Sequence, residues 1–338
     1  HGLWSEGRFF KASIDKQPFS RNYMGEAAKT KQLPFKVLKI LPTPTIEDVY
    51  AIAVGVDGQL CRLDEQWNPI EAFASPFPAP IEHVIMIDDV LVATWIDREL
   101  LVARMGAIRC TEPFQQGVER GDVRKASTIQ NAIQPAGVLW AHVLDAEPLG
   151  LARHDDGFIF ILWNRGVYSF NANGVEQWRA PPPEWPDLNK IPMSQESVDI
   201  CVTDSSIEIW SRAGGCCRLS KSDGTLIGTG SFVLDGSLDK VESIGLNRLL
   251  VLKNGHIYWY KAGKIVCEAT SSGPIQSIMY NEESNTWYLA GWREELELMQ
   301  NDFRRFDNRE VVVQHIRSPD GLWVVTNDGM MNHSILTE

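Results

Sequence analysis

The amino-acid sequence predicts an all-β fold of antiparallel strands, and three observations support this prediction. Long stretches with apolar residues at helical spacing are nearly absent, whereas short runs rich in Val, Ile, Trp, Tyr and Leu recur throughout the chain. Eight Asn-Gly or Asp-Gly pairs, from Asp57 to Asp328, punctuate these runs. Such pairs adopt the positive φ of tight hairpin turns, which join antiparallel strands. The third observation is an internal repeat.

The repeat is a short phrase in which two intervening residues separate two apolar ones, with a second β run following. Seven copies begin at Ile46, Ile81, Trp140, Val198, Val241, Ile275 and Val313. Their starts are 35, 59, 58, 43, 34 and 38 residues apart, and the two long intervals contain irregular inserts at about 114–136 and 179–196. A four-stranded propeller blade takes about 40–45 residues. We therefore predict a seven-bladed β-propeller of four-stranded antiparallel blades, within a range of six to eight blades.

Closure of the ring requires a strand from outside the last copy. That copy begins at Val313 and leaves room for about three strands before Glu338, whereas a blade has four. Lys36–Leu41 precedes the first copy and alternates like an outer strand, so we expect it to complete the last blade and to protect an edge. The propeller domain then spans residues 36–338, and residues 1–35 form a basic N-terminal extension.

Two stretches resemble the repeats of WD40-type β-propellers. Gln314–Thr326, with its Ser-Pro-Asp-Gly turn, resembles the first two strands of a WD repeat. Pro274–Tyr280 followed by Trp287–Gly291 is a looser copy. The chain has no Trp-Asp dipeptide, and its Gly255-His256 pair does not open a blade, so the resemblance is to a divergent member.

A second resemblance leaves the subfamily open. The segment Gly166–Asn171, leading to Gly174 and Trp178, also resembles quinoprotein-like blades. Together the two resemblances cover about residues 40–338 and imply a propeller fold.

The charge distribution bears on partners. Lys and Arg number 32 against 44 Asp and Glu, a net charge of −12 that repels nucleic-acid phosphates and argues against nucleic-acid binding by the acidic body. Residues 1–40 nevertheless hold eight basic and three acidic side chains, or +5, which leaves −17 for the remainder. A basic arm on an acidic body either binds an acidic partner or folds back on its own domain.

The cysteines and the hydropathy indicate a compartment. Six cysteines are spread over long intervals without a C-x-x-C pair, so neither a disulfide framework nor a zinc site is indicated. Free cysteines in apolar runs are typical of a reducing compartment, and we expect the cytoplasm. No apolar stretch reaches the ~18 residues of a membrane span, so no membrane association is expected. The chain begins with His1, which leaves open whether a leader precedes it.

No catalytic, cofactor or metal motif is recognisable, and we assign none. His83, His142 and His315 occupy the same place in three copies and are expected at equivalent heights on inner strands near the channel. Such a ring of imidazoles either binds a metal or titrates near neutral pH, or it ties down turns and carboxylates; we favour the structural interpretation. These three histidines are the channel-proximal candidates.

The acidic residues of the repeat support an alternative. Propeller glycosidases place carboxylates on inner strands around a central pocket. The candidates by position are Glu47, Asp48, Glu82, Asp199 and Glu242. These acids recur because the repeat recurs, and no pair is singled out by its context.

The inserts supply the partner-binding candidates. Arg179 and Trp185 lie in a stiff proline-rich stretch, which either presents Trp185 to a partner or uses it to pin the loop onto its own blade. Arg120, Arg124 and Lys125 lie in the other insert, as a basic loop for an acidic protein or a nucleic acid, or as solvated surface.

The sequence thus predicts a non-catalytic protein–protein interaction scaffold. One or more proteins of a multisubunit assembly would dock on the propeller face, the rim loops and the basic N-terminal arm. The alternatives are a propeller enzyme, and a propeller that binds a small molecule or carbohydrate at the channel mouth.

Overall fold

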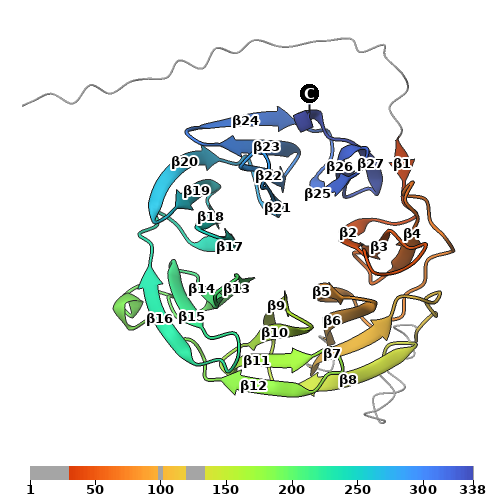
Figure 1. The fold of residues 1–338 in the computed structure, drawn as a ribbon, viewed down its shortest axis with the longest axis horizontal. Coiled ribbons are helices and arrows are strands. Elements are labelled where there is room, and N and C mark those ends of the chain that lie inside the picture. The colour runs from red at the N-terminus through yellow and green to blue at the C-terminus, as the bar shows by residue number, and fades with distance from the viewer. Residues whose placement is uncertain (1–29, 98–101, 119–133, 338) are drawn as a thin grey trace, which may run out of the picture.

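A computed structural model describes residues 30–97, 102–118 and 134–337. Seven antiparallel sheets surround a central opening, with the first strand of each sheet nearest the centre (Figure 1). The predicted seven-bladed propeller is therefore confirmed. In the described part of the chain the regular structure is otherwise limited to two short 3-10 turns, η1 (Pro186–Leu188) and η2 (Ile335–Thr337). The same part contains no helix long and apolar enough to cross a membrane.

The blades follow one another along the chain, and the strands of each blade are ordered from the channel outward. Blades one to three are β2 (Val37–Pro42), β3 (Ala51–Gly55), β4 (Leu60–Leu63); β5 (Ile81–Ile87), β6 (Val90–Asp97), β7 (Val102–Arg109), β8 (Val138–Leu144); and β9 (Pro148–His154), β10 (Gly157–Leu162), β11 (Gly166–Asn171), β12 (Glu176–Ala180). Blades four and five are β13 (Ser197–Val202), β14 (Ile207–Ser211), β15 (Gly215–Leu219), β16 (Leu226–Ser231); and β17 (Leu238–Ile244), β18 (Asn247–Leu252), β19 (His256–Lys261), β20 (Lys264–Thr270). Blades six and seven are β21 (Ile275–Asn281), β22 (Thr286–Gly291), β23 (Glu294–Met299), β24 (Asp302–Asp307); and β25 (Val312–Ser318), β26 (Gly321–Thr326), β27 (Met330–His333), β1 (Lys31–Gln32).

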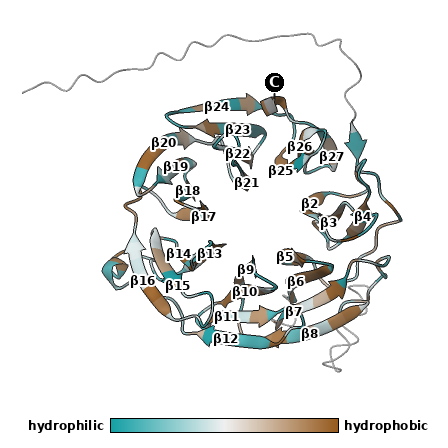
Figure 2. Cartoon of the chain, in the orientation of Figure 1, coloured by the Kyte–Doolittle hydropathy of each residue, from teal (hydrophilic) through white to brown (hydrophobic). Residues whose placement is uncertain are grey.

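The core lies between neighbouring blades. Every residue of the second strands β3, β10, β14 and β22 is buried, because adjacent blades cover both faces of these strands. One apolar cluster joins Ile52 of blade one to Leu91 and Trp95 of blade two. The outer strands, in contrast, carry many exposed residues. Hydrophilic and hydrophobic residues both occur along the outer strands (Figure 2). Burial on two faces explains the continuous apolar runs of the sequence.

An N-terminal strand closes the ring, as expected, but it is a different segment from the one predicted. Lys31 and Gln32 pair with Met331 and Met330 of the last blade (Figure 1). The expected segment, Lys36–Leu41, instead contributes to β2, the inner strand of blade one, which pairs with β3. The reason is burial: Val37, Ile40 and Leu41 are all buried, which an outer strand does not provide. The propeller therefore begins within the range expected as an extension.

Blade one lacks a regular fourth strand. Among the described residues of this blade, only two isolated bridges, Leu60 to Ala74 and Leu63 to Pro69, continue the sheet beyond β4. The other six blades have four strands each.

Five of the seven repeat copies lie on inner strands, namely those beginning at Ile81, Val198, Val241, Ile275 and Val313. Two do not. Ile46–Val49 forms the turn between β2 and β3, and Trp140–Val143 lies in β8, the outer strand of blade two. The inner strand of blade three is β9, which begins at Pro148. A phrase of two apolar residues separated by two others fits an inner strand, an outer strand or a turn equally well. It therefore predicts the number of blades better than it predicts which segment is the inner strand.

Candidate functional site

All seven inner strands contain a β-bulge at the same place. In each, the second residue is skipped by the pairing register; these residues are Leu38, Glu82, Leu149, Val198, Asp239, Gln276 and Val313. A bulge bends its strand and re-aims the side chain that follows. The third residues are Lys39, His83, Gly150, Asp199, Lys240, Ser277 and Gln314. These seven positions are therefore structural equivalents around the channel.

Four of these third residues tie their blade to the next. Gln314 accepts from the Ile40 amide (2.8 Å) and donates to the Ile40 carbonyl (3.0 Å). Lys39 Nζ donates to the Val84 carbonyl (3.5 Å). These hydrogen bonds join blade seven to blade one and blade one to blade two. In both cases the partner is the fourth residue of the next inner strand.

The remaining ties run in the same direction. His83 Nε2 donates to the Pro148 carbonyl (3.2 Å), and Asp199 Oδ2 accepts from the Val241 amide (2.8 Å). Gly150 has no side chain that could form such a hydrogen bond, and a Cβ at this position would lie 3.2 Å from Ile200 of blade four. Polar groups that satisfy backbone atoms of the adjacent blade hold the ring rigid.

The central cavity has a volume of about 650 Å³ and holds charges of both signs. Lys39, Lys240, Asp199 and Glu242 all line it. Burial raises the pKa of Asp199 to about 6, although the Val241 amide opposes this rise. Burial and the nearby Asp199 charge raise the pKa of Glu242 to about 7, against the opposing charge of Lys39. Burial also lowers the pKa of Lys39. Burial in the channel thus moves the pKa of both carboxyl groups upward, towards neutral pH.

Replacement of Glu242 by Gln is expected to flatten the pH dependence of stability. A carboxyl whose pKa is raised in the folded state binds its proton more tightly there than in the unfolded chain. Stability accordingly falls as pH rises from about 4.5 to about 7. In the wild type, the free energy of unfolding should be lower at pH 8 than at pH 5 by on the order of 2 kcal/mol, and the Gln variant should lack this difference. Denaturant unfolding at the two pH values measures it.

The control for this prediction is Glu268→Gln, an exposed carboxyl on β20 of the same blade. Its substitution should leave the pH profile of the free energy of unfolding unchanged. Equal profiles for wild type and Glu242→Gln would show that Glu242 keeps an ordinary pKa.

The three candidate histidines do not form a ring. His83 and His315 lie on inner strands and line the central cavity, but His142 lies on the outer strand β8 and is not channel-proximal. His142 Nε2 donates to the Gly174 carbonyl (2.8 Å). His315 is buried and contacts Glu295, its Nε2 lying 3.0 Å from Oε2. Each of the three therefore binds a carbonyl or a carboxylate. No group of three metal-ligating side chains occurs among residues that the structure describes.

The candidate acids separate into two groups. Glu82, Asp199 and Glu242 lie on inner strands and line the cavity. Glu47 and Asp48 lie in the turn between β2 and β3, because the first repeat copy is not a strand.

Of the two alternatives for Trp185, the structure shows the pinning one. Trp185 is 2% exposed, and a Cβ on Gly215 would lie only 2.4 Å from its ring, so the loop packs onto blade four. Arg179 is exposed; it pairs with Glu176 (2.7 Å) and lies over the Tyr168 ring. Arg120, Arg124 and Lys125 lie outside the described residues.

Two exposed tryptophans are not among the candidates predicted from the sequence. Trp163 is 55% exposed in the turn between β10 and β11, and Trp292 is 51% exposed in the turn between β22 and β23. Both turns join the second and third strands of their blades, and turns of a meander alternate between its two ends. We call the face that carries these turns and the loops between blades the BC face. A signal existed: in each case a Trp beside Asn or Arg sits between two β runs.

Other exposed apolar residues share the BC face. Met193, in the loop before β13, is 62% exposed, and Val233, in the loop before β17, is 98% exposed. Isolated exposed apolar residues are common, and these four belong to turns and loops at different positions around the same face.

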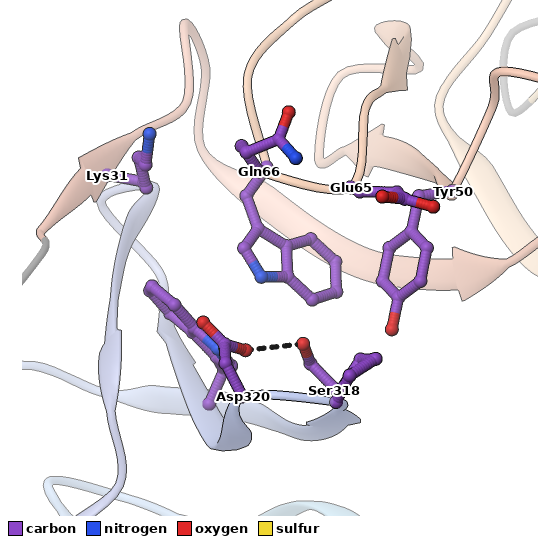
Figure 3. A pocket seen from close by; sticks show the side chains of 9 residues that line it. Lys31, Tyr50, Glu65, Gln66, Ser318 and Asp320 are labelled. Carbon is purple, nitrogen blue, oxygen red and sulfur yellow. Dashed lines mark hydrogen bonds between the residues drawn. The ribbon is translucent and has the colours of Figure 1, made fainter.

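A second cavity, of about 540 Å³, lies at the closing seam (Figure 3). Lys31 of β1, Tyr50 and Glu65 of blade one, and Ser318 and Asp320 of blade seven face it. Ser318 Oγ and Trp323 Nε1 donate to Asp320 Oδ1 (2.6 and 2.9 Å), which lowers the Asp320 pKa. The Ser-Pro-Asp-Gly turn therefore anchors a tryptophan at the seam.

Trp67 also lines the seam, in an uncommon backbone conformation. Its φ of 64° is left-handed, which is strained for a bulky residue. Asp64 holds the turn by accepting from the amides of Gln66 (2.9 Å) and Asn68 (2.8 Å). Trp67 thereby packs against Trp323 of the last blade, with ring centroids 6.1 Å apart.

Comparison with solved structures agrees with this geometry, and the fold is a seven-bladed propeller similar to those of WD40 domains. The WD40 propeller domain of Doa1 is similar, with 12% identity over 90% of this chain and 95% of that one (TM-score 0.59). So is the propeller domain of Cps50 (Swd1) from Myceliophteria thermophila, with 9% identity over 91% and 98% (TM-score 0.62). The computationally designed protein Ika8 shows 8% identity over 89% and 96% (TM-score 0.57). No family model matches the chain, and neither does any curated protein.

Proposed function

We propose that this protein is a non-catalytic scaffold that docks protein partners on its BC face. The observation that carries the proposal is the pair of half-exposed tryptophans, Trp163 and Trp292, in equivalent turns of that face. Tryptophan dominates the energetics of protein–protein interfaces because its large ring is buried on docking at small entropic cost.

Rigidity of the disc supports the same role. The ties from Gln314, Lys39, His83 and Asp199 to the next blade hold the turns of the face at fixed spacing. A preorganised surface loses little conformational entropy on binding. The partners are, in this proposal, proteins of a multisubunit assembly, with the exposed Arg179 at the rim of the face as a further contact.

The double substitution Trp163→Ser and Trp292→Ser is expected to reduce partner recovery at least tenfold. Two such anchors each contribute about 2 kcal/mol or more to an interface. The measurement is affinity purification from the native cell with quantitative mass spectrometry. The matched control is Val143→Ser with Val175→Ser, exposed apolar residues outside the BC face.

Equal recovery by both double variants would refute the BC face as the docking surface. Recovery of no protein at stoichiometric level would refute the scaffold and favour a ligand at the channel mouth.

We also propose that the protein resides in a reducing compartment such as the cytoplasm, since all six cysteines are buried thiols. The same purification from separated cell fractions tests this.

A further inference from the structure

The outer strand of blade four, β16, presents a free and uncharged edge. It is the last strand of its sheet, and Thr225–Leu234 contains no charged residue. The outer strands β12, β20 and β24 each carry charged side chains, which discourage pairing with other chains. The outer strand β8 of blade two, like β16, carries no Asp, Glu, Lys or Arg. In Figure 2, β16 is brown to near-white along its length. Its edge lacks the usual protection.

Backbone groups on this edge face outward. The Phe232 amide donates to the Gly214 carbonyl (2.9 Å), and Gly230 and Gly228 pair with Cys216 and Arg218 in the same register. Hydrogen-bonded and non-bonded pairs alternate in an antiparallel ladder. The amides and carbonyls of Thr229 and Ser231 therefore point away from β15, available to another strand.

One face of β16 is bare of side chains. Gly228 and Gly230 lie two residues apart on this face, and a Cβ on Gly230 would meet no atom within 4 Å. The guanidinium of Arg218 reaches across Gly228, 3.5 Å from the position of its missing Cβ. Within the described part of the chain, Arg218 has no ion-pair partner. A cation therefore lies exposed beside the free edge.

A cavity of about 280 Å³ adjoins the same strand. Gly230 and Phe232 line it from blade four, and Leu246, Ala262 and Gly263 line it from two turns of blade five. Its lining also includes Arg218 and the ion pair between Glu208 and Arg248, whose charges neutralise each other. Leu246 is 69% exposed. The cavity is wide enough for one apolar side chain.

We propose that β16 is a strand-addition site for an extended segment of a partner protein. The segment pairs with the outward groups of Thr229 and Ser231, as extended peptides do at other exposed sheet edges. Its residue opposite Gly230 is apolar and enters the cavity. Its residue opposite Gly228, two positions away on the same side, is acidic and pairs with Arg218. The site deepens the proposed scaffold role and rests on it for its biological partner.

A displayed library of random twelve-residue peptides, selected on the full chain, tests this proposal directly. The expected consensus has an apolar and an acidic residue two positions apart among β-branched residues. Thr229→Pro removes an outward amide without breaking the ladder to β15 and should weaken the selected peptides at least tenfold. Thr229→Val keeps the amide and should bind as wild type does.

A charge exchange supplies the second arm. Arg218→Glu should weaken peptides with the acidic residue at least tenfold, and peptides with Lys in its place should regain affinity. Equal binding to Thr229→Pro and wild type, or a consensus without the acidic residue, would overturn the proposal, and so would the absence of any enriched peptide. Melting temperatures confirm that each variant is folded. These results do not depend on the BC face, so failure of strand addition and failure of the scaffold role are distinguishable.

Discussion

A chain that lacks residues 1–35 is expected to be less stable than the full chain by about 5 kcal/mol. The deletion removes the β1 pairing and exposes the sites of Leu33 and Phe35, which are 2% and 8% exposed. Each buried apolar side chain contributes about 1.5–3 kcal/mol and each lost hydrogen bond about 1 kcal/mol. Calorimetry should show a melting temperature lower by on the order of 10 °C.

Point variants distinguish the effect of losing the contacts that close the ring from the effect of removing a long segment. Leu33→Ala with Phe35→Ala keeps β1 and should lose a large part of the same stability, because both side chains pack in the cluster that joins blades one and seven. Lys36→Ala, an exposed neighbour, should have no effect. If the truncated chain melts at the temperature of the full chain, the ring is not closed by this strand.

Replacement of His315 by Leu is expected to cost about 3 kcal/mol of unfolding free energy. Glu295 is 1% exposed, and its Oε2 accepts from His315 Nε2 (3.0 Å) and Ser334 Oγ (2.6 Å). Removal of the imidazole leaves the buried carboxylate without this partner. Loss of one partner is strongly destabilising, because the charge of the other remains buried without compensation. Urea unfolding measures the effect.

The double variant His315→Leu with Glu295→Leu provides the control. It removes both partners and should recover roughly half or more of the lost stability, since no carboxylate remains buried. A single variant as stable as wild type would show that the histidine is not a structural anchor and would reopen a functional role for it.

The fold was predictable from the sequence because blades repeat at a spacing that few other architectures share. The closing strand was not, since alternation in Lys36–Leu41 is common to inner and outer strands and only the burial of Val37, Ile40 and Leu41 distinguishes them. His142 was misplaced for a related reason: the phrase around it fits the outer strand β8 as well as an inner one. Position along a blade is set by tertiary packing, which a four-residue phrase does not encode.

The candidate site was predictable only in part. His83, His315, Asp199 and Glu242 were expected near the channel and do line the central cavity. The bulge that aims His83 and Asp199 is a matter of pairing register between strands, so no single strand reveals it. The sequence does not single out Trp163 and Trp292, because hydrophobic runs indicate strands, although a tryptophan within a turn has few neighbours to bury it.

Hydrogen exchange of the purified complex, compared with the free protein, tests the scaffold account most directly. Docking on the BC face should slow exchange in the turns at 163–166 and 291–294 and in the loops at 189–195 and 231–237. The turns of the opposite face, such as 172–175 and 262–263, should exchange as they do in the free protein. Protection confined to that opposite face, or to the residues that line the channel, would contradict the account.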